Sequence, residues 1–343
     1  MTRAAQLGVR TFRAPDRFDD ADIEGLLDAK GDRTVSVCIP CRDEAATIGP
    51  LVRVIRDELI ERTGIVDELI VLDDRSTDDT ARVATHAGAR VVSIDDVHAE
   101  HGTGHGKGNA LWSSLLVSHG DLVVWCDGDV TSFEADWVMK LVAPLFTDDT
   151  VGMVKAIYDR PENRGGGGRT TELVARPLMS RFFPELTGLA QPLSGEYAVR
   201  RTIVEQLDFV QGWGVEMALL IDIAERFGAD AIGQVDLGHR LHRHHDLHRL
   251  SVQAAEVTST VLDRAGVVRG RVDDPTLRRA DDSEVPLNLD VRPAVASLHR
   301  SAAQRSERAP TQRESTELES TDLEPTELER SGLERSGLRR RAS

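Results

Sequence analysis

The sequence predicts an α/β fold with a mainly parallel sheet and flanking helices. Short apolar, β-branched runs such as VSVCIP, DELIVLD and RVVSI alternate with helical patterns in the first half of the chain, and this alternation is typical of βαβ units with right-handed crossovers. Polar clusters follow three of the expected strands, where parallel sheets bind their ligands. At 343 residues and 40% hydrophobic composition, the chain can bury the core of one large domain or two smaller ones.

The expected elements follow one another at short intervals. Strands are expected at 35–40, 67–73, 90–94, 122–126 and near 151–158, with an apolar segment at 234–237, and helices at 45–62, 78–86, 107–116, 170–182, 215–227 and up to about 264. Residues 1–33 form a polar, partly ordered lead-in, which 34–150 and 151–268 follow as two halves. From 269 to 343 we expect a mostly disordered tail, because the leucines near its end recur every five residues and form no buried helix face.

Composition excludes several classes of function. The net charge of −16 argues against nonspecific binding to nucleic acid or to an anionic membrane. No apolar run approaches the roughly 18 residues that a membrane span needs, and the first residues lack the apolar core of a signal peptide. The three cysteines form no disulfide framework, which suits a reducing compartment. We therefore expect a cytoplasmic protein that binds neither nucleic acid nor membrane.

The apolar run LVVWC ends in two carboxylates, Asp127 and Asp129, with Gly128 between them. Because side chains alternate along a strand, both acids leave the strand on the same side, where they can approach a divalent cation or a sugar nucleotide. Two acids after a strand also occur in ordinary turns. The polar clusters at 40–44 and 73–79 favour the functional interpretation, because all three strand ends converge on one cleft of a parallel sheet.

Four further motifs resemble those of a known family. They are GKGNALW at 106–112, GGRTTELVARP at 167–177, QPLSGEY at 191–197 and GWGVE at 212–216. Together with the strand-end clusters, they resemble the actinobacterial glucosyl-3-phosphoglycerate synthases, which are GT-A glycosyltransferases of the family-2-like type. The resemblance covers residues 34–266, and the chain departs from the family pattern at Arg75, Trp213 and 157–159.

The resemblance implies a GT-A fold in which 34–150 binds the nucleotide sugar and the helical half 151–268 binds the acceptor. It implies transfer of glucose from UDP-glucose to 3-phosphoglycerate, with retention at the anomeric carbon and dependence on Mg²⁺ or Mn²⁺. Two alternatives stay open. One is a related GT-A enzyme with another donor or acceptor, such as a mannosyl-3-phosphoglycerate synthase or a lipid-phosphate glycosyltransferase; the other is a noncatalytic protein that binds a sugar nucleotide. A homodimer is also left open.

The family pattern assigns the donor side of the site. The residues expected to bind the nucleotide sugar are Pro40, Arg42, Glu44, Ser76, Lys107, Asp127 and Gly128. A cation held by Asp129 would stabilise the negative charge of the diphosphate leaving group, and the family pattern places a second metal ligand on His242. Lys107 also needs an anionic partner on physical grounds, because a cation at a helix start opposes the helix dipole.

Gly168, Arg169 and Thr171 are expected to bind the acceptor. Backbone amides at a helix start and a neighbouring arginine suit a phosphate or a carboxylate, although a flexible glycine linker is the alternative interpretation. Glu216 is the carboxylate expected near the reacting centre, and Asp129 and Lys107 are the other catalytic candidates. Glu216 either orients the substrates or acts as a nucleophile, since retention fits both front-face attack and double displacement.

Overall fold

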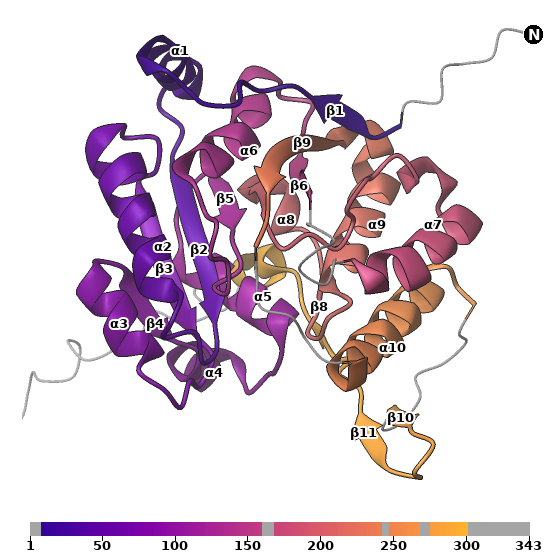
Figure 1. Cartoon of the computed structure of the whole chain (residues 1–343). Helices are drawn as coiled ribbons and strands as arrows, with labels where there is room; N and C mark the ends of the chain where they lie inside the picture. The colour runs from indigo at the N-terminus through magenta and orange to yellow at the C-terminus, as the bar shows by residue number, and fades with distance from the viewer. Residues whose placement is uncertain (1–7, 160–167, 242–246, 268–274, 301–343) are drawn as a thin grey trace, which may run out of the picture. The chain divides into compact units, whose positions relative to one another are not determined.

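An eight-stranded sheet lies at the centre of the fold (Figure 1). The computed structural model describes residues 8–159, 168–241, 247–267 and 275–300. The strands of this sheet are β1 (Arg10–Phe12), β2 (Val35–Cys41), β3 (Glu68–Asp73), β4 (Arg90–Ser93), β5 (Leu122–Trp125), β6 (Met153–Asp159), β7 (Tyr197–Arg200) and β9 (Ile232–His239). Their order is β1-β9-β6-β7-β5-β2-β3-β4, and only β7 runs antiparallel to its neighbours. The predicted mainly parallel α/β sheet is confirmed.

Helices cover both faces of the sheet because alternate strand residues point to opposite sides. Val37 and Val124 belong to one buried cluster, whereas Cys38 and Trp125, one residue further along the same strands, belong to the other. The first cluster packs under α1 (Asp20–Lys30), α2 (Ile48–Val54), the π-helix Ile55–Arg62, α3 (Thr80–Ala87) and α6 (Ala135–Thr147). The second packs under α4 (Ile94–His101), α5 (Lys107–Val117), α7 (Arg176–Phe182), α9 (Val215–Phe227) and α10 (Leu247–Arg264).

The predicted lead-in contains two regular elements that the sequence analysis did not predict. Strand β1 adds a parallel edge to β9, and α1 packs Ile23 and Leu26 onto the core. Helix α1 begins at a capping box, in which Asp19 accepts a hydrogen bond from the backbone of Asp22 at 2.9 Å and Asp22 accepts one from Asp19 at 3.2 Å. With so few buried apolar residues, the order of α1 depends on its cap and on its packing.

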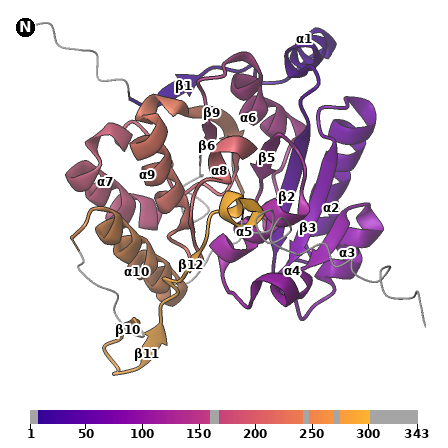
Figure 2. The same ribbon diagram turned by 180° about the vertical axis from the view of Figure 1, so that it is seen from behind.

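Residues 275–300, within the segment predicted to be a mostly disordered tail, contain regular elements in the structure. They form a hairpin of β10 (Thr276–Arg278) and β11 (Glu284–Pro286), followed by β12 (Val291–Arg292), which pairs antiparallel with β8 (Phe209–Val210). Trp112 of α5 donates a hydrogen bond from Nε1 to the carbonyl of Pro293 at 2.8 Å, so this segment lies against α5 (Figure 2). The sequence did not indicate these elements because their order comes from distant partners and not from local apolar periodicity. Residues 301–343, with the five-residue repeat, lie outside the described residues.

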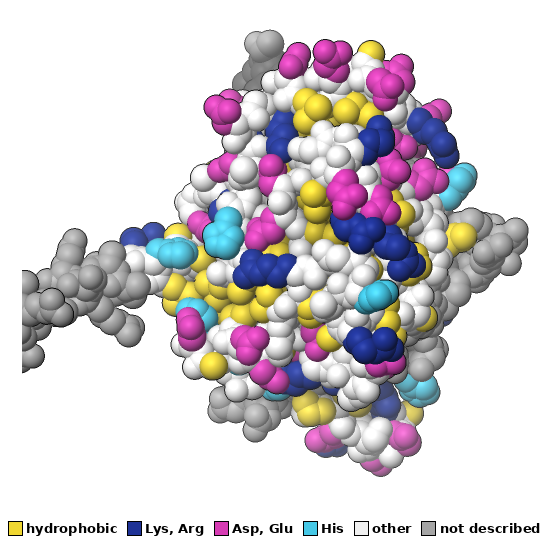
Figure 3. Space-filling model, turned by 90° about the vertical axis from the view of Figure 1, so that its left-hand side faces the viewer, with side chains coloured by type: hydrophobic (Ala, Val, Ile, Leu, Met, Phe, Trp, Pro, Cys, Tyr) yellow, Lys and Arg dark blue, Asp and Glu magenta, His cyan; other side chains and the backbone are white. Residues whose placement is uncertain are grey.

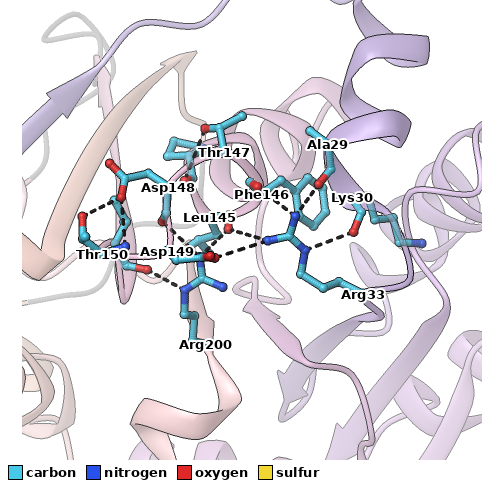
Figure 4. Close-up of polar contacts among 12 residues, drawn as sticks. Ala29, Lys30, Arg33, Leu145, Phe146, Thr147, Asp148, Asp149, Thr150 and Arg200 are labelled. Carbon is cyan, nitrogen blue, oxygen red and sulfur yellow. Dashed lines mark hydrogen bonds and ion pairs between the residues drawn. The ribbon is translucent and has the colours of Figure 1, made fainter.

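Two arginines close the C-terminal end of α6 (Figure 4). Arg33 donates to the carbonyl of Phe146 at 2.8 Å, and Arg200 donates to the carbonyl of Asp148 at 3.0 Å. Both guanidinium groups also approach the carboxylate of Asp149. A helix end leaves carbonyl groups without partners and carries partial negative charge. The two arginines donate hydrogen bonds to these carbonyls and place positive charge beside them. They also connect α6 to β7 and to the turn after α1.

Acidic and basic side chains are interspersed over the face of the molecule in Figure 3. This agrees with a chain that is 29% charged and carries a net charge of −16. None of the helices that the structure describes combines the length and the apolar character that crossing a membrane requires.

Candidate active site

Lys107, the first residue of α5, is the centre of a buried charge cluster. Its Nζ lies 2.8 Å from Oδ1 of Asp127, just after β5, and 2.8 Å from Oε1 of Glu216, in the first turn of α9. Burial opposes the charge of Lys107, but the two carboxylates outweigh this effect and raise its pKa well above the ordinary value. The structure thus brings three predicted site residues together and gives Lys107 the anionic partners that its place at a helix start requires.

Arg240, directly after β9, is a second cation of the cluster, and the sequence analysis did not predict it. Its side chain is 4% exposed, and its Nη2 lies 2.7 Å from Oδ2 of Asp127, 3.0 Å from Oε1 of Glu196 and 3.6 Å from Oδ1 of Asp129. Burial opposes ionisation of Asp127, yet Lys107 and Arg240 hold its pKa well below the ordinary range. The sequence signal was hidden because Arg240 belongs to a histidine- and arginine-rich stretch, which is typical of an exposed segment.

Asp129 has an excess of negative charge around it. Burial, followed by the charge of Asp127, raises the pKa of Asp129 to about 7, and Arg240 opposes this rise only in part. A carboxylate in such surroundings fits a divalent cation, which would supply the missing positive charge. Within the described ranges, no three His, Cys, Asp or Glu side chains are grouped as a metal site. The second predicted ligand, His242, lies outside those ranges.

Lys155 of β6 is a further buried cation, with 1% of the residue exposed. Its Nζ lies 4.1 Å from the centroid of the Tyr197 ring and donates a hydrogen bond to the carbonyl of Ser194. Burial lowers the pKa of Lys155 to about 7, although Glu216 opposes this shift. Neither Lys155 nor Tyr197 was predicted as a site residue, because both read as ordinary positions of buried strands.

Two buried polar atoms on neighbouring residues of the SGEY motif have no hydrogen-bond partner among the described residues. They are Oε2 of Glu196 and the hydroxyl of Tyr197. A third such atom, Oδ1 of Asp73, lies at the end of β3. Buried polar atoms are almost always hydrogen-bonded in folded proteins, so these three fit a place where water, an ion or a substrate completes the bonding.

Glycines allow the backbone to approach the acids closely. A Cβ at Gly195 would lie 2.0 Å from Oδ2 of Asp127, and a Cβ at Gly128 would lie 2.7 Å from Sγ of Cys41. The carbonyl of Gly128 also accepts a hydrogen bond from the hydroxyl of Thr47 at 2.7 Å. Packing against Asp127 therefore requires glycine at position 195, and packing against Cys41 requires glycine at position 128.

The predicted nucleotide-binding residues of β2 and β3 lie at one edge of the sheet. Asp43, with a φ of 58°, locks the two strand ends together: its amide donates to Oγ of Ser76 at 3.0 Å, and its Oδ1 accepts from the amide of Thr77 at 2.7 Å. The amide of Glu44 donates to the hydroxyl of Thr80 at 2.7 Å. The other predicted residues of this edge are Pro40, at the end of β2, and the exposed Arg42.

The predicted acceptor residues lie on a separate element. Gly168 has a φ of 79°, and its carbonyl accepts a hydrogen bond from the amide of Glu172 at 2.8 Å, at the start of the π-helix Thr171–Ala175. Arg169 is exposed and Thr171 is buried. The residues immediately before Gly168 lie outside the described part of the chain, so the acceptor assignment stays a prediction.

A mainly parallel sheet that gathers paired acids, a helix-start lysine and a buried arginine at its strand ends defines a GT-A glycosyltransferase. The model of the family "Glycosyl transferase family 2" matches residues 36–207. Glucosyl-3-phosphoglycerate synthases of Petrotoga mobilis and Mycobacterium tuberculosis are each 46% identical to this chain, over 69% and 70% of it and 75% and 76% of their own lengths. The chain belongs to glycosyl transferase family 2 and, within it, to the glucosyl-3-phosphoglycerate synthases.

Solved structures agree with this assignment. The crystal structure of the Mycobacterium tuberculosis glucosyl-3-phosphoglycerate synthase with Mn²⁺, UDP-glucose and phosphoglyceric acid has a TM-score of 0.77 and 41% identity, and covers 86% of this chain and 100% of that chain. A second structure of that enzyme, with Mn²⁺, UDP and glucosyl-3-phosphoglycerate, has a TM-score of 0.75 and 41% identity over 84% of this chain and 99% of that chain.

Proposed function

We propose that this protein transfers glucose from UDP-glucose to 3-phosphoglycerate, with retention at the anomeric carbon and with Mg²⁺ or Mn²⁺ as cofactor. The observation that carries the proposal is the position of Lys107 between Asp127 and Glu216 at the strand ends of a GT-A sheet. Relatives that share this fold bind Mn²⁺, UDP-glucose and phosphoglyceric acid. The alternatives of another donor or acceptor, or of a noncatalytic protein, are not favoured.

Asp129 and His242 would hold the metal, which supplies positive charge to the diphosphate leaving group. Cationic side chains of the protein supply the other positive charges of the site. Lys107 and Arg240 stay protonated because their carboxylate partners raise the pKa of each despite burial. Neither side chain can therefore act as a general base at neutral pH. Both act as fixed positive charges beside a buried site, where such charges stabilise an anion strongly.

We propose that Glu216 binds and orients a substrate, and that the glucose is transferred by front-face attack. Its carboxylate is almost fully buried and is held by the Lys107 ammonium at 2.8 Å. Pairing with a cation stabilises the carboxylate and lowers its reactivity as a nucleophile. To test this, the protein is incubated with a slow 2-deoxy-2-fluoro donor, and peptides containing Glu216 are analysed by mass spectrometry. A glucosyl adduct on Glu216 would establish double displacement instead.

The reaction itself is tested with purified protein, 3-phosphoglycerate and Mg²⁺, incubated separately with UDP-glucose, GDP-glucose and GDP-mannose. Mass spectrometry should find glucosyl-3-phosphoglycerate with UDP-glucose as the preferred donor. Asp129→Asn should abolish transfer and weaken UDP binding only when metal is present, because its carboxylate acts through the cation. UDP binding in EDTA should be the same for both proteins, which makes the metal-free measurement the control. Normal turnover of Asp129→Asn in Mg²⁺ would disprove the metal assignment.

We further propose a homodimer. Leu173, in the π-helix Thr171–Ala175, is 76% exposed, and we use it to test this proposal. Light scattering of the wild type and of Leu173→Asp gives the test: a dimeric wild type and a monomeric variant are expected. A monomeric wild type would refute the proposal.

We propose a cytoplasmic location. Cys38, Cys41 and Cys126 are all buried and free, and burial raises the pKa of all three thiols. Free thiols are typical of a reducing compartment. Fractionation of the native host, followed by immunoblotting, should find the protein with cytoplasmic markers and not in the secreted fraction.

A further inference from the structure

Glu256, on α10, is a buried carboxylate with no place in the proposed chemistry. Its side chain is 3% exposed. One oxygen, Oε2, accepts a hydrogen bond from the amide of Trp213 at 2.7 Å, and the other, Oε1, accepts one from the amide of Asn288 at 2.8 Å. Trp213 lies in the turn that leads into α9, and Asn288 lies between β11 and β12. One side chain therefore joins α10 to two segments that are distant from it in the sequence.

The side chain of Asn288 continues the connection to the loop that precedes Lys107. The Nδ2 of Asn288 donates to the carbonyl of His105 at 2.6 Å. The amide of His105 donates to Oε1 of Gln211 at 3.0 Å, and the carbonyl of Gln211 accepts from the amide of Asn109 at 3.1 Å. The backbone on both sides of Lys107 is thus fixed by Gln211 and Asn288.

Close packing makes the connection rigid. A Cβ at Gly212 would lie 2.3 Å from Oε2 of Glu256, and a Cβ at Gly214 would lie 1.9 Å from Oγ1 of Thr260 on the same helix. The two glycines of the GWGVE motif therefore let α10 lie directly against the turn that begins α9. Glu216 is in the first turn of α9, so the position of this turn sets the position of its carboxylate.

We infer that Glu256 and Asn288 are positioning residues. They hold the start of α5 and the start of α9 at the separation needed for the Lys107–Glu216 ion pair. This inference rests on the proposed function. It also gives residues 286–292 a role in the site, where the sequence predicted disorder. The mechanism is geometric: a buried carboxylate that accepts two amide hydrogen bonds fixes both amides, and loss of either bond frees one side of the pair.

We call the hydrogen bonds that Glu256 and the Asn288 side chain make with Trp213, Asn288 and His105 the clasp. The test compares two clasp variants with two controls. Glu256→Gln keeps the shape of the side chain but points an amide N–H at one of the two backbone donors. Asn288→Ala removes only the bond to His105, and the side chain it truncates is partly exposed. This variant therefore tests the inference if Glu256→Gln does not fold. Asp263→Asn makes the same change on an exposed carboxylate of α10. Leu26→Ala destabilises the opposite core cluster, far from the clasp.

Each variant is measured in two ways. We expect both clasp variants to lower kcat for glucosyl transfer by about 30- to 100-fold, as small misplacements of reacting groups do, with the KM for UDP-glucose within about threefold of wild type. Hydrogen exchange followed by mass spectrometry should become faster in residues 103–109 of both variants, and in residues 211–216 of Glu256→Gln, which alters the bond to the Trp213 amide. The two controls should keep normal kcat per folded molecule and normal exchange in both segments.

Two results would overturn the inference. One is that the clasp variants behave as Leu26→Ala does, losing stability with unchanged kcat; the other is unchanged exchange in residues 103–109 of Asn288→Ala or in residues 211–216 of Glu256→Gln. The exchange measurement needs no catalysis. If the wild type forms no product, the proposed function fails, and the exchange pattern still decides whether Glu256 and Asn288 fix the two segments.

Discussion

The ammonium group of Lys107 lies 2.8 Å from Oε1 of Glu216, and the two residues are brought together from the first turns of two different helices. The same ammonium lies 2.8 Å from Oδ1 of the partly buried Asp127, so one cation pairs with two carboxylates. Because a buried carboxylate without a partner is costly, this arrangement couples the stability of the fold to the chemistry of the site.

Lys107→Met should lower kcat by at least about 100-fold, in the range seen when one charge-stabilising group is removed from an active site. It should also reduce the free energy of unfolding by about 3–5 kcal/mol, because Asp127 and Glu216 lose their shared cation in a buried site. Steady-state kinetics and urea unfolding measure the two effects. Lys30→Met is the control, since the buried Lys30 forms an ion pair with the exposed Asp67 at 2.8 Å, away from the cluster. Normal turnover of Lys107→Met would show that the ion pair is structural only.

Arg240→Met should be strongly destabilising, by about 3–5 kcal/mol, because it removes the ion-pair partner of the buried Glu196 and leaves Asp127 with Lys107 alone. Adding Glu196→Gln should restore part of this stability, since the neutral amide no longer needs a positive partner, but it should not restore transfer. Calorimetric Tm values of the single and double variants test the coupling. Strictly additive changes in Tm would mean that the Arg240–Glu196 contact contributes little.

Lys155→Met should change how stability depends on pH. Burial lowers the pKa of Lys155 from 10.5 to about 7 in the folded protein, so between these two values the unfolded chain binds a proton that the folded chain lacks. The contribution of Lys155 to stability therefore rises with pH across that window, and its burial cost is largest below pH 7. The variant should gain most over the wild type at pH 6 and progressively less towards pH 10, measured by urea unfolding. A stability difference that is constant with pH would show that Lys155 is charged throughout.

Arg169→Ala should raise the KM for 3-phosphoglycerate by about 10- to 150-fold, the range expected for a charged hydrogen bond of about 1.5–3 kcal/mol, and should leave UDP-glucose binding close to normal. Arg169→Lys should rescue only part of the loss, because a point charge does not reproduce the planar fork. Arg181→Ala is the control, as an exposed arginine of α7 that contacts the Phe182 ring.

Gly168→Val should reproduce the acceptor defect of the Arg169 variant. Gly168 has a φ of 79°, which a β-branched residue adopts only with strain, so the backbone approach to the anion would be lost. Calorimetric titration with both substrates separates the two sites. Loss of UDP-glucose binding with retained 3-phosphoglycerate binding would place the acceptor elsewhere.

Local sequence patterns predicted the elements whose signal is contained within a short window. The β-branched run at 35–40 and the apolar run before Asp127 became β2 and β5, and the helix expected at 215–227 has those bounds in the structure. The site candidates Lys107, Asp127 and Glu216, which the sequence analysis took from motifs, lie together in the structure. The convergence of parallel strand ends predicted only that the clusters at 40–44, 73–79 and 127–129 would share one cleft.

Only the tertiary structure decided which cations serve the buried acids and which distant segments hold them. Arg240 lies in a stretch with the composition of an exposed surface, Lys155 lies in a buried strand, and Asn288 lies in a region with little apolar periodicity. Their roles depend on a charge or a hydrogen-bond partner that is far away in the sequence. Periodicity records which face of an element is buried, whereas electrostatic pairing depends on distance in space, and that distance exists only once the chain has folded.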